Sequence, residues 1–211
     1  DQLKRFLQDA PVIVSEGRAW PVDITFLGAA KPRERIGERM ANALKQTMAK
    51  HPEESILAFL PGEGEIREVE SALNNTVSHQ QINIFPLYGN LSIEAQRKAV
   101  EPTESGKQKI VLATNIAESS LTIDGVNIVV DCGLMRQARF DPNTAMSRLY
   151  TEKISRASAD QRTGRAGRTG PGHCYRLWSK EQDQQLAQQT VPEIMLADLS
   201  SMAIALLSWG L

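Results

Sequence analysis

Short runs of apolar residues recur along this chain, and stretches with apolar residues at helical spacing separate them. The runs are rich in Val, Ile and Leu, which is typical of strands buried on both faces of a parallel sheet. The expected strands are residues 22–27, 55–60, 82–86, 109–114, 126–131 and 173–178. Because strands and helices alternate with short links, we predict an α/β sandwich built on a mainly parallel sheet with right-handed crossovers.

Helices are expected between several of these strands. The first should run from residue 32 to about residue 50, because Pro32 suits a first turn and Pro52 stops the continuation. Its buried side is formed by Ile36, Met40, Leu44 and Met48. The next helix follows residues 61–65 and turns Ile66, Val69 and Leu73 inward. A further helix is expected from about residue 92 to residue 100, and we assign none of these helices any chemistry.

Residues 134–154 predict a β-hairpin. Two strand-like segments, 135–140 and 146–151, flank a turn with Pro142 at its first central position. One interpretation is an edge ribbon that protects the sheet. The arginines of the hairpin favour contact with nucleic acid instead; they are Arg136, Arg139 and Arg148.

The C-terminal part from Pro192 predicts two short helices. The second has an apolar face formed by Leu199, Met202, Leu206 and Leu207. So few residues cannot bury that face alone, so we expect it to lean on the preceding domain.

The strongest chemical signal is the segment QRTGRAGR, residues 161–168. If the segment is helical, its residues Gln161, Arg165 and Arg168 share one face and form a set of planar donors suited to phosphate oxygens. Glycine costs a helix interior about 1 kcal/mol relative to Ala. Gly164 and Gly167 therefore suggest that another backbone or a ligand comes close. The plainer alternative is a surface helix with arginines on its solvent side.

Residues 158–161 also match a capping box, with Ser158 at the N-cap. In that case Gln161 would serve as a helix cap, which competes with a role on phosphate. Residues 179–182 repeat the cap pattern and should start another helix.

A second polar segment follows the expected strand 109–114. Hydroxyl and amide side chains gather there, as in segments that hold a sugar-phosphate backbone without reading bases. They are Thr114, Asn115, Ser119, Ser120 and Thr122. Asp124 adds an acceptor suited to ribose hydroxyls. A polar loop that caps its own helix would look similar. Because ligand-facing residues lie at the carboxyl ends of parallel strands, Pro61-Gly62, Tyr88-Gly89-Asn90 and Thr114-Asn115 should share one edge of the domain.

Composition is that of an ordinary globular protein: 211 residues, 41% hydrophobic and 23% charged, with a net charge of −1. Near-neutrality argues against a general polyanion binder. Residues 133–176, however, carry nine Lys/Arg and three Asp/Glu, a local charge of +6, which fits contact with phosphates at one place. A surface balanced by salt bridges is the alternative, weakened by the shortage of local acids.

The chain has no apolar run near the ~20 residues of a membrane span and no signal-peptide pattern. We therefore expect a cytoplasmic protein without membrane contact. Cys132 and Cys174 are expected to be reduced core thiols rather than a disulfide. Three scattered histidines predict no transition-metal site. The N-terminus lacks an initiator Met, so we expect a piece of a longer protein.

These segments resemble motifs of the DEAH-box RNA helicases of superfamily 2. QRTGRAGR is similar to motif VI, ATNIAESSLTIDG (residues 113–125) to motif V, Leu87–Leu91 to motif IVa and Phe59–Ile66 to motif IV. The whole chain resembles the second RecA-like domain of such an enzyme. The resemblance implies a RecA-like three-layer sandwich with a mainly parallel sheet, a β-hairpin insertion and C-terminal helices.

The resemblance also implies roles for single residues. Toward the terminal phosphate of ATP it places Arg165, Arg168 and Gln161, and toward the ribose Asp124 with Thr122. For RNA phosphates it implies Thr114, Asn115, Ser120 and the turn Gly89–Asn90. A hairpin stands at this place in the family where strands part, which adds Arg136 and Arg139. Val100, before Glu101-Pro102, occupies the position where many eukaryotic relatives carry an aromatic that stacks on adenine, so weak base selectivity is a further hypothesis.

A P-loop for the nucleotide is missing. The only candidate, Gly106-Lys107, has Glu101 at the upstream Gly position and Gln108 at the Ser/Thr position. Magnesium and the β- and γ-phosphates should therefore be held by a first RecA-like domain, and the isolated chain should not hydrolyse ATP. We divide the chain into a connector (1–20, with a strand at 12–14), the second RecA-like domain (21–190) and the start of a winged-helix segment (191–211). The alternative function is a non-catalytic RNA-binding or regulatory module, and DNA in place of RNA is not excluded.

Overall fold

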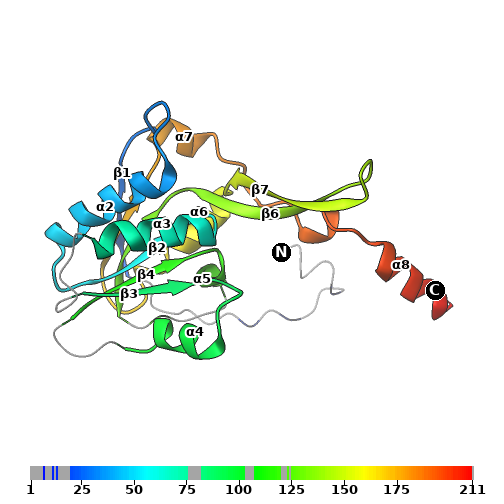
Figure 1. Ribbon diagram of the computed structural model, residues 1–211, viewed down its shortest axis with the longest axis horizontal. Helices are drawn as coiled ribbons and strands as arrows, with labels where there is room; N and C mark the ends of the chain where they lie inside the picture. Colours follow the sequence, from blue (N-terminus) through cyan, green and yellow to red (C-terminus); the bar gives the residue numbers. More distant parts are fainter. Residues whose placement is uncertain are drawn as a thin grey trace.

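A computed structural model describes residues 7, 11, 13, 20–75, 82–102, 107–119, 123 and 125–210. The connector at residues 1–20 and its strand at 12–14 fall almost entirely outside the described residues. Six strands form one sheet: β1 (Val22–Phe26), β2 (Ser55–Phe59), β3 (Ile82–Leu87), β4 (Gln108–Ala113), β5 (Val126–Asp131) and β8 (Gly172–Arg176). Their order is β1-β8-β5-β2-β4-β3, and every pairing in the sheet is parallel (Figure 1). The predicted strands and the parallel sheet are confirmed.

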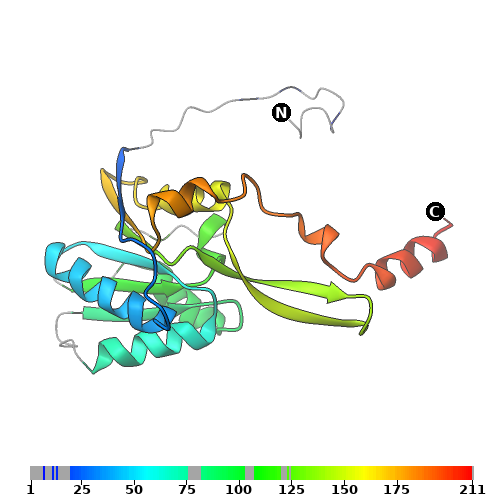
Figure 2. The same cartoon turned by 90° about the horizontal axis from the view of Figure 1, so that it is seen from above.

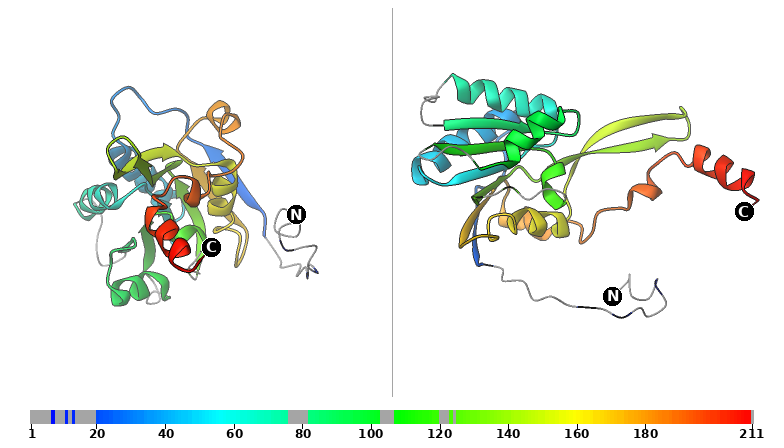
Figure 3. Two further views of the ribbon diagram at one scale, coloured as in Figure 1. Left: turned by 90° about the vertical axis from the view of Figure 1, so that its right-hand side faces the viewer. Right: turned by 90° about the horizontal axis from the view of Figure 1, so that it is seen from below.

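Helices cover both faces of the sheet. The helices are α2 (Ile36–Lys50), α3 (Glu63–Asn74), α4 (Ile93–Val100), α5 (Ile116–Ser119), α6 (Arg156–Thr163) and α7 (Lys180–Gln184). Successive residues of a strand point to opposite faces of the sheet and pack into two hydrophobic cores. Ile56 and Ala58 pack with α2 and α3, whereas Leu57 and Phe59 pack on the side of α4 and α5. Figure 3 shows α3 and the gold α6 on opposite sides of the sheet. The molecule therefore has three layers.

The predicted inward faces of α2 and α3 are confirmed, but the predicted starts of both helices are wrong: α3 begins at Glu63, inside the expected link 61–65. Met40, Leu44, Ile66, Val69 and Leu73 are fully buried. Helix α2, however, begins at Ile36 instead of residue 32. Arg33 has a φ of 64°, in the left-handed region, and Arg35 is extended. The backbone therefore cannot be helical before residue 36.

The hairpin consists of β6 (Leu134–Asp141) and β7 (Met146–Lys153), which pair only with each other in an antiparallel sheet. It extends away from the layered body (Figures 1 and 2). The hairpin itself is confirmed, but the idea that it protects an edge of the main sheet is not, because neither strand joins that sheet.

The C-terminal segment contains a 3-10 helix, η1 (Glu193–Met195), and helix α8 (Ser200–Ser208). The amide of Phe140 in the hairpin donates to the carbonyl of Leu196, 2.8 Å away. Helix α8 buries none of its residues, and it lies beyond the hairpin, away from the sheet (Figure 2). The expectation that its apolar face, formed by Leu199, Met202, Leu206 and Leu207, leans on the domain is therefore wrong. No helix in the described ranges is both long and apolar enough to cross a bilayer.

Candidate functional site

Helix α6 ends earlier than its sequence suggests. Ser155 is its N-cap, and the Ser155 hydroxyl accepts from the amide of Ser158 at 3.1 Å. The predicted capping box with Ser158 at the N-cap is therefore wrong, and Gln161 lies exposed in the last turn instead of capping the helix. Gly164 is the C-cap. Because the helix stops at Thr163, Arg165 and Arg168 lie in the turn that follows, and the predicted helical stripe is wrong.

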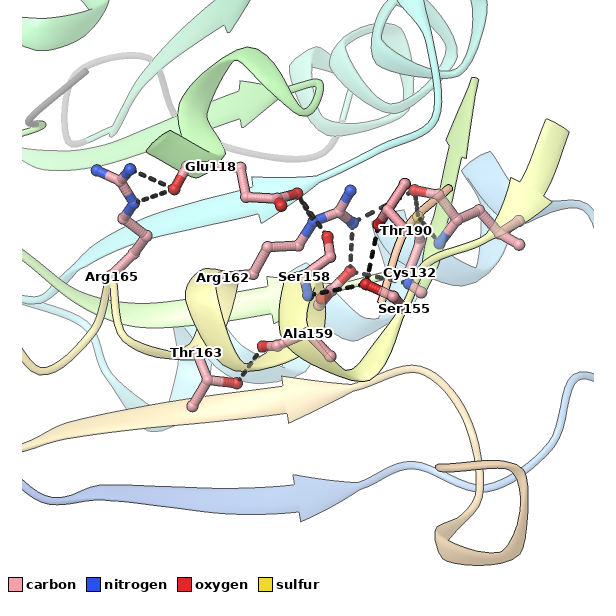
Figure 4. Close-up of polar contacts among 12 residues, drawn as sticks. Glu118, Cys132, Ser155, Ser158, Ala159, Arg162, Thr163, Arg165 and Thr190 are labelled. Carbon is pink, nitrogen blue, oxygen red and sulfur yellow. Dashed lines mark hydrogen bonds and ion pairs between the residues drawn. The ribbon is translucent and has the colours of Figure 1, made fainter. Parts of the chain in front are cut away.

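The segment after α6 carries two arginines, Arg165 and Arg168, that differ in burial. Arg165 is buried, and its Nε donates to the backbone carbonyl of Glu118 at 3.0 Å; its Nη2 donates to the same oxygen (Figure 4). Burial lowers the pKa of Arg165, and the positive charge of Arg168 lowers it further. Arg168 is exposed. One arginine is thus fixed by a neutral main-chain acceptor, and a second reaches the surface beside it.

The two glycines of this segment differ in what surrounds them. A Cβ on Gly167 would lie 2.6 Å from the carbonyl oxygen of Trp20 and 2.8 Å from a methyl carbon of Val22. The amide of Trp20 also donates to the Gly167 carbonyl at 3.0 Å. The prediction that another backbone comes close is confirmed at Gly167. At Gly164 the nearest atoms to a Cβ would be 3.4 Å away and belong to α6 itself, so no other described backbone segment comes close there, and the approach of a ligand stays a prediction.

Sequence reasoning missed the role of Arg162. This side chain is completely buried, and its guanidinium is held by two carboxylates: Nη1 lies 2.9 Å from Asp131 Oδ1 and Nε lies 3.0 Å from Glu118 Oε2. Burial by itself would lower the pKa of Arg162, but the two carboxylates raise it above its ordinary value. Arg162 Nη1 also lies 3.3 Å from the Leu134 carbonyl, and the guanidinium lies over the Phe59 ring. Arg162 is therefore a structural cation inside the domain.

The expected edge of the sheet is formed as predicted. The Thr114 amide donates to the Leu87 carbonyl at 3.1 Å, which places the end of β4 beside the end of β3. Gly89 and Asn90 form an exposed turn there, and Asn115 is also exposed. A hollow of about 360 Å³ is lined by Asn115, Glu118 and Gln161 among others. Ser120, Thr122 and Asp124 lie outside the described residues.

The basic region is more fully paired than its composition suggested. Arg136 lies 3.0 Å from Glu65, and Arg139 lies 2.6 Å from Glu152. Arg176 pairs with Asp160 and Asp183. Two of these four acids, Glu65 and Asp183, come from outside residues 133–176, which is why the count of local acids underestimated the salt bridges. Arg136 also covers Gly62, where a Cβ would lie 2.6 Å from its Nη1.

Cys132 and Cys174 are buried free thiols, as predicted. Burial, together with the charge of Asp131, raises the pKa of Cys132 to about 12. Burial raises the pKa of Cys174 to about 11. Neither thiol is suited to nucleophilic chemistry, which needs the thiolate. Within the described part of the chain, no three His, Cys, Asp or Glu side chains gather as a metal site would require.

Comparison with known proteins gives the family. Residues 39–170 match the family described as the helicase conserved C-terminal domain. The chain is also 46% identical over 210 residues to a protein of Escherichia coli (strain K12) named ATP-dependent RNA helicase HrpB, and this match covers 100% of the chain and 26% of that protein. The chain belongs to the helicase conserved C-terminal domain family.

Solved structures agree in detail with this helicase C-terminal domain. A crystal structure of Escherichia coli DEAH/RHA helicase HrpB superposes with a TM-score of 0.92 at 45% identity, and one of E. coli DExH-box NTPase HrpB superposes with a TM-score of 0.89 at 45% identity. Each match covers 100% of the chain and 26% of the solved one. The resemblance to DEAH-box helicases and the RecA-like fold are thereby confirmed. The chain spans about a quarter of the length of these relatives.

Within the helicase C-terminal domain, motif VI divides into arginines of two kinds. Arg162 points into the body and is held by carboxylates, whereas Arg165 and Arg168 follow the end of α6 in a turn. A helical projection of the sequence cannot make this distinction. The signal that could have found it was Gly164, because glycine near the end of a helical pattern is a frequent terminator.

Proposed function

We propose that this helicase C-terminal domain is the second RecA-like motor half of an ATP-dependent RNA helicase. Its part would be to present arginines to ATP bound by a first RecA-like domain and to hold the RNA backbone. The name of the Escherichia coli relative supports the activity, and the 26% coverage of that relative leaves room for the partner domain. The division into residues 1–20, 21–190 and 191–211 is part of this proposal, as is a cytoplasmic location.

The observation that carries the proposal is that buried Arg165 and exposed Arg168 follow the end of the same helix and that the charge of Arg168 acts on Arg165. Burial and the neighbouring guanidinium both disfavour the charge on Arg165. A terminal phosphate arriving between them would relieve that repulsion and accept planar donors from both. We assign Arg165 and Arg168 to charge on the transferring γ-phosphoryl group, a role worth roughly 10³–10⁵ in rate. Gln161 would assist from the end of α6, with Asp124 and Thr122 holding the ribose.

The RNA would lie along the carboxyl edge of the sheet. Backbone phosphates there would meet Thr114, Asn115, Ser120, Gly89 and Asn90. Amide and hydroxyl side chains at this edge suit phosphate and sugar contacts, which position a strand without reading its sequence. Arg136 and Arg139 on the hairpin would add contacts by exchanging their present carboxylate partners for phosphates. DNA would satisfy the same backbone contacts.

Magnesium is left to the partner domain, since the described residues offer no cluster of carboxylates for it. When bound there, the ion would neutralise charge on the β- and γ-phosphates. This chain contributes the guanidiniums, and closure of the two halves would bring them to the triphosphate. Reopening while Thr114 and Asn115 hold the RNA would move the domain along the strand.

The test is an ATPase assay of the protein that contains this chain together with its N-terminal neighbour, with and without RNA. RNA-stimulated hydrolysis is expected, and the isolated chain should have no ATPase activity and weak nucleotide binding. If the neighbouring domain has no P-loop and no ATPase is found, the chain is instead a non-catalytic RNA-binding or regulatory module.

A further inference from the structure

Glu118 contacts the motif VI segment through two different groups. Its carboxylate oxygen Oε2 accepts from the Ser158 hydroxyl at 2.6 Å and from Arg162 Nε at 3.0 Å. Its backbone carbonyl accepts from the Arg165 guanidinium (Figure 4). The carboxylate therefore attaches Glu118 to helix α6, while the carbonyl of the same residue fixes the direction of Arg165.

Helix α5, which carries Glu118, cannot hold its own position. It has four residues, fewer than an isolated helix needs to be stable. Its amides at Ala117 and Glu118 donate to the carbonyls of Thr114 and Asn115 at 3.2 and 2.9 Å. The short helix is therefore continuous with the residues proposed to hold RNA. Helix α5 is also held by the buried side chain of Ala117 and by the Glu118 carboxylate.

The Glu118 carboxylate is anchored by Arg162, a cation that has further partners of its own. Arg162 is fully buried and also bonded to Asp131 at the end of β5, and Asp131 accepts from the Gly133 amide at 2.8 Å. The Arg162–Leu134 contact extends the network to the first residue of the hairpin. Because Arg162 is buried and has several partners, we expect it to stay in place when α5 moves. A small shift of α5 relative to Arg162 then moves the Glu118 carbonyl that orients Arg165.

We propose that Glu118 is a positioning residue that couples RNA bound at Thr114 and Asn115 to the orientation of Arg165. This inference rests on the proposed function. RNA contact sets the place of α5, the Glu118 carboxylate holds α5 against α6, and the Glu118 carbonyl directs the guanidinium toward the nucleotide. Loss of the carboxylate anchor uncouples the two sites without removing a group that touches ATP or RNA.

The experiment is steady-state ATPase of the full-length protein carrying Glu118→Gln, measured with and without RNA. The amide keeps the size of the side chain and removes its charge. We expect the ratio of the RNA-stimulated to the basal kcat to fall roughly 2- to 30-fold. The Kd for RNA and the KM for ATP should change by less than about twofold, because the substitution removes no group that contacts RNA or ATP. An unchanged ratio, or an equal fall in both rates, overturns the inference.

Three further variants complete the design. Glu94→Gln removes a carboxylate from an exposed i,i+4 pair with Lys98 and should leave the ratio unchanged. Ser158→Ala removes one of the two hydrogen bonds to the Glu118 carboxylate and should lower the ratio less than Glu118→Gln does. If Glu118→Gln does not fold, Ser158→Ala becomes the test. An unchanged ratio in Ser158→Ala then overturns the inference. Arg165→Ala separates the two proposals. If it leaves hydrolysis intact, the proposed function fails; if it abolishes hydrolysis while Glu118→Gln keeps the ratio, only the coupling fails.

Discussion

The guanidinium of Arg162 lies 4.8 Å from the centroid of the Phe59 ring, at the end of strand β2. Phe59 is completely buried, so this cation sits in the apolar layer between the sheet and α6. The contact adds a cation–π interaction to two carboxylate partners. The position of Arg162 is therefore determined by packing as well as by charge.

Arg162→Met should strongly destabilise the domain. The variant keeps much of the side-chain volume but leaves the carboxylates of Asp131 and Glu118 without their cation. Breaking a buried pair in this way costs about 3–5 kcal/mol in the free energy of unfolding. Urea unfolding measures the loss. Arg139→Ala is the matched control, because its pair with Glu152 is exposed and should be worth less than about 1 kcal/mol. Equal losses in the two variants would contradict a structural role for Arg162.

Arg168→Ala in the full-length protein should abolish ATP hydrolysis. We expect a fall in kcat of at least about 10³-fold, as for removal of an arginine finger. RNA affinity should be nearly unchanged, because Arg168 is not among the residues proposed for RNA. Turnover and RNA binding are measured on the same preparation. Arg97→Ala, an exposed arginine paired with Glu101 on α4, should leave both intact. Normal turnover in Arg168→Ala would refute the assignment.

The glycines of the turn after α6 should respond oppositely to alanine. Gly167→Ala places a methyl group against the Trp20 carbonyl and should cost about 1–3 kcal/mol. Gly164→Ala has room and a φ of −60°, which alanine adopts freely. It should be neutral or stabilise by up to about 1 kcal/mol. The midpoint of urea unfolding distinguishes them, provided that the m-value is unchanged. A tolerated Gly167→Ala would mean that the backbone approach is not tight.

The two buried thiols predict a loss of stability at alkaline pH. Their folded pKa values are raised to about 12 and about 11, above those of the unfolded chain. Below pH ~8.5 both thiols are neutral in the folded and in the unfolded chain, so their contribution to the free energy of unfolding is fully present there. Above that pH the unfolded chain loses protons first, and stability falls by up to about 1.4 kcal/mol per pH unit for each thiol. Unfolding at pH 8 and pH 10 tests this, and a Cys132→Ala, Cys174→Ala double variant should have a flatter profile.

The base of the nucleotide should be weakly selected. Val100 ends helix α4 and is partly buried against the core that contains Leu87 and Val111. It therefore offers no aromatic face at the position where related helicases stack adenine. Rates of the full-length protein with ATP, GTP, CTP and UTP should be comparable. A strong preference for ATP would show that another residue reads the base.

The fold was largely readable from the sequence, because strands buried on both faces leave continuous apolar runs. The helix faces at Ile66, Val69 and Leu73 were predictable for the same reason, since burial imposes a period. Helix ends were less predictable. Arg33 has a φ of 64°, although Pro32 suggested a helix start, and α6 ends at Thr163, although arginines at helical spacing continue beyond it. Gly164 was the local signal for the second end, but the helical spacing of the arginines outweighed it in the prediction.

The site was predictable in its residue types but not in their division of roles. Glu118 and Asp131 lie 44 and 31 positions from Arg162, so the sequence does not indicate which motif VI arginine meets carboxylates. The sequence also does not show that Glu118 binds Arg162 through its side chain and Arg165 through its main chain. The hairpin arginines illustrate the same limit, since Arg136 pairs with Glu65 on α3, 71 positions away.

The order of strands also has a consequence for synthesis on the ribosome. Strand β1 precedes the other five strands of this sheet in the chain, yet it lies at the edge and pairs with β8, where residue 22 meets residue 172. The nascent chain can assemble β2, β3, β4 and β5 as they emerge, whereas β1 must wait until β8 has been translated. Pairing across such a sequence separation is slow and leaves β1 unpaired meanwhile. The first of these six strands to leave the ribosome is thus among the last to join the sheet.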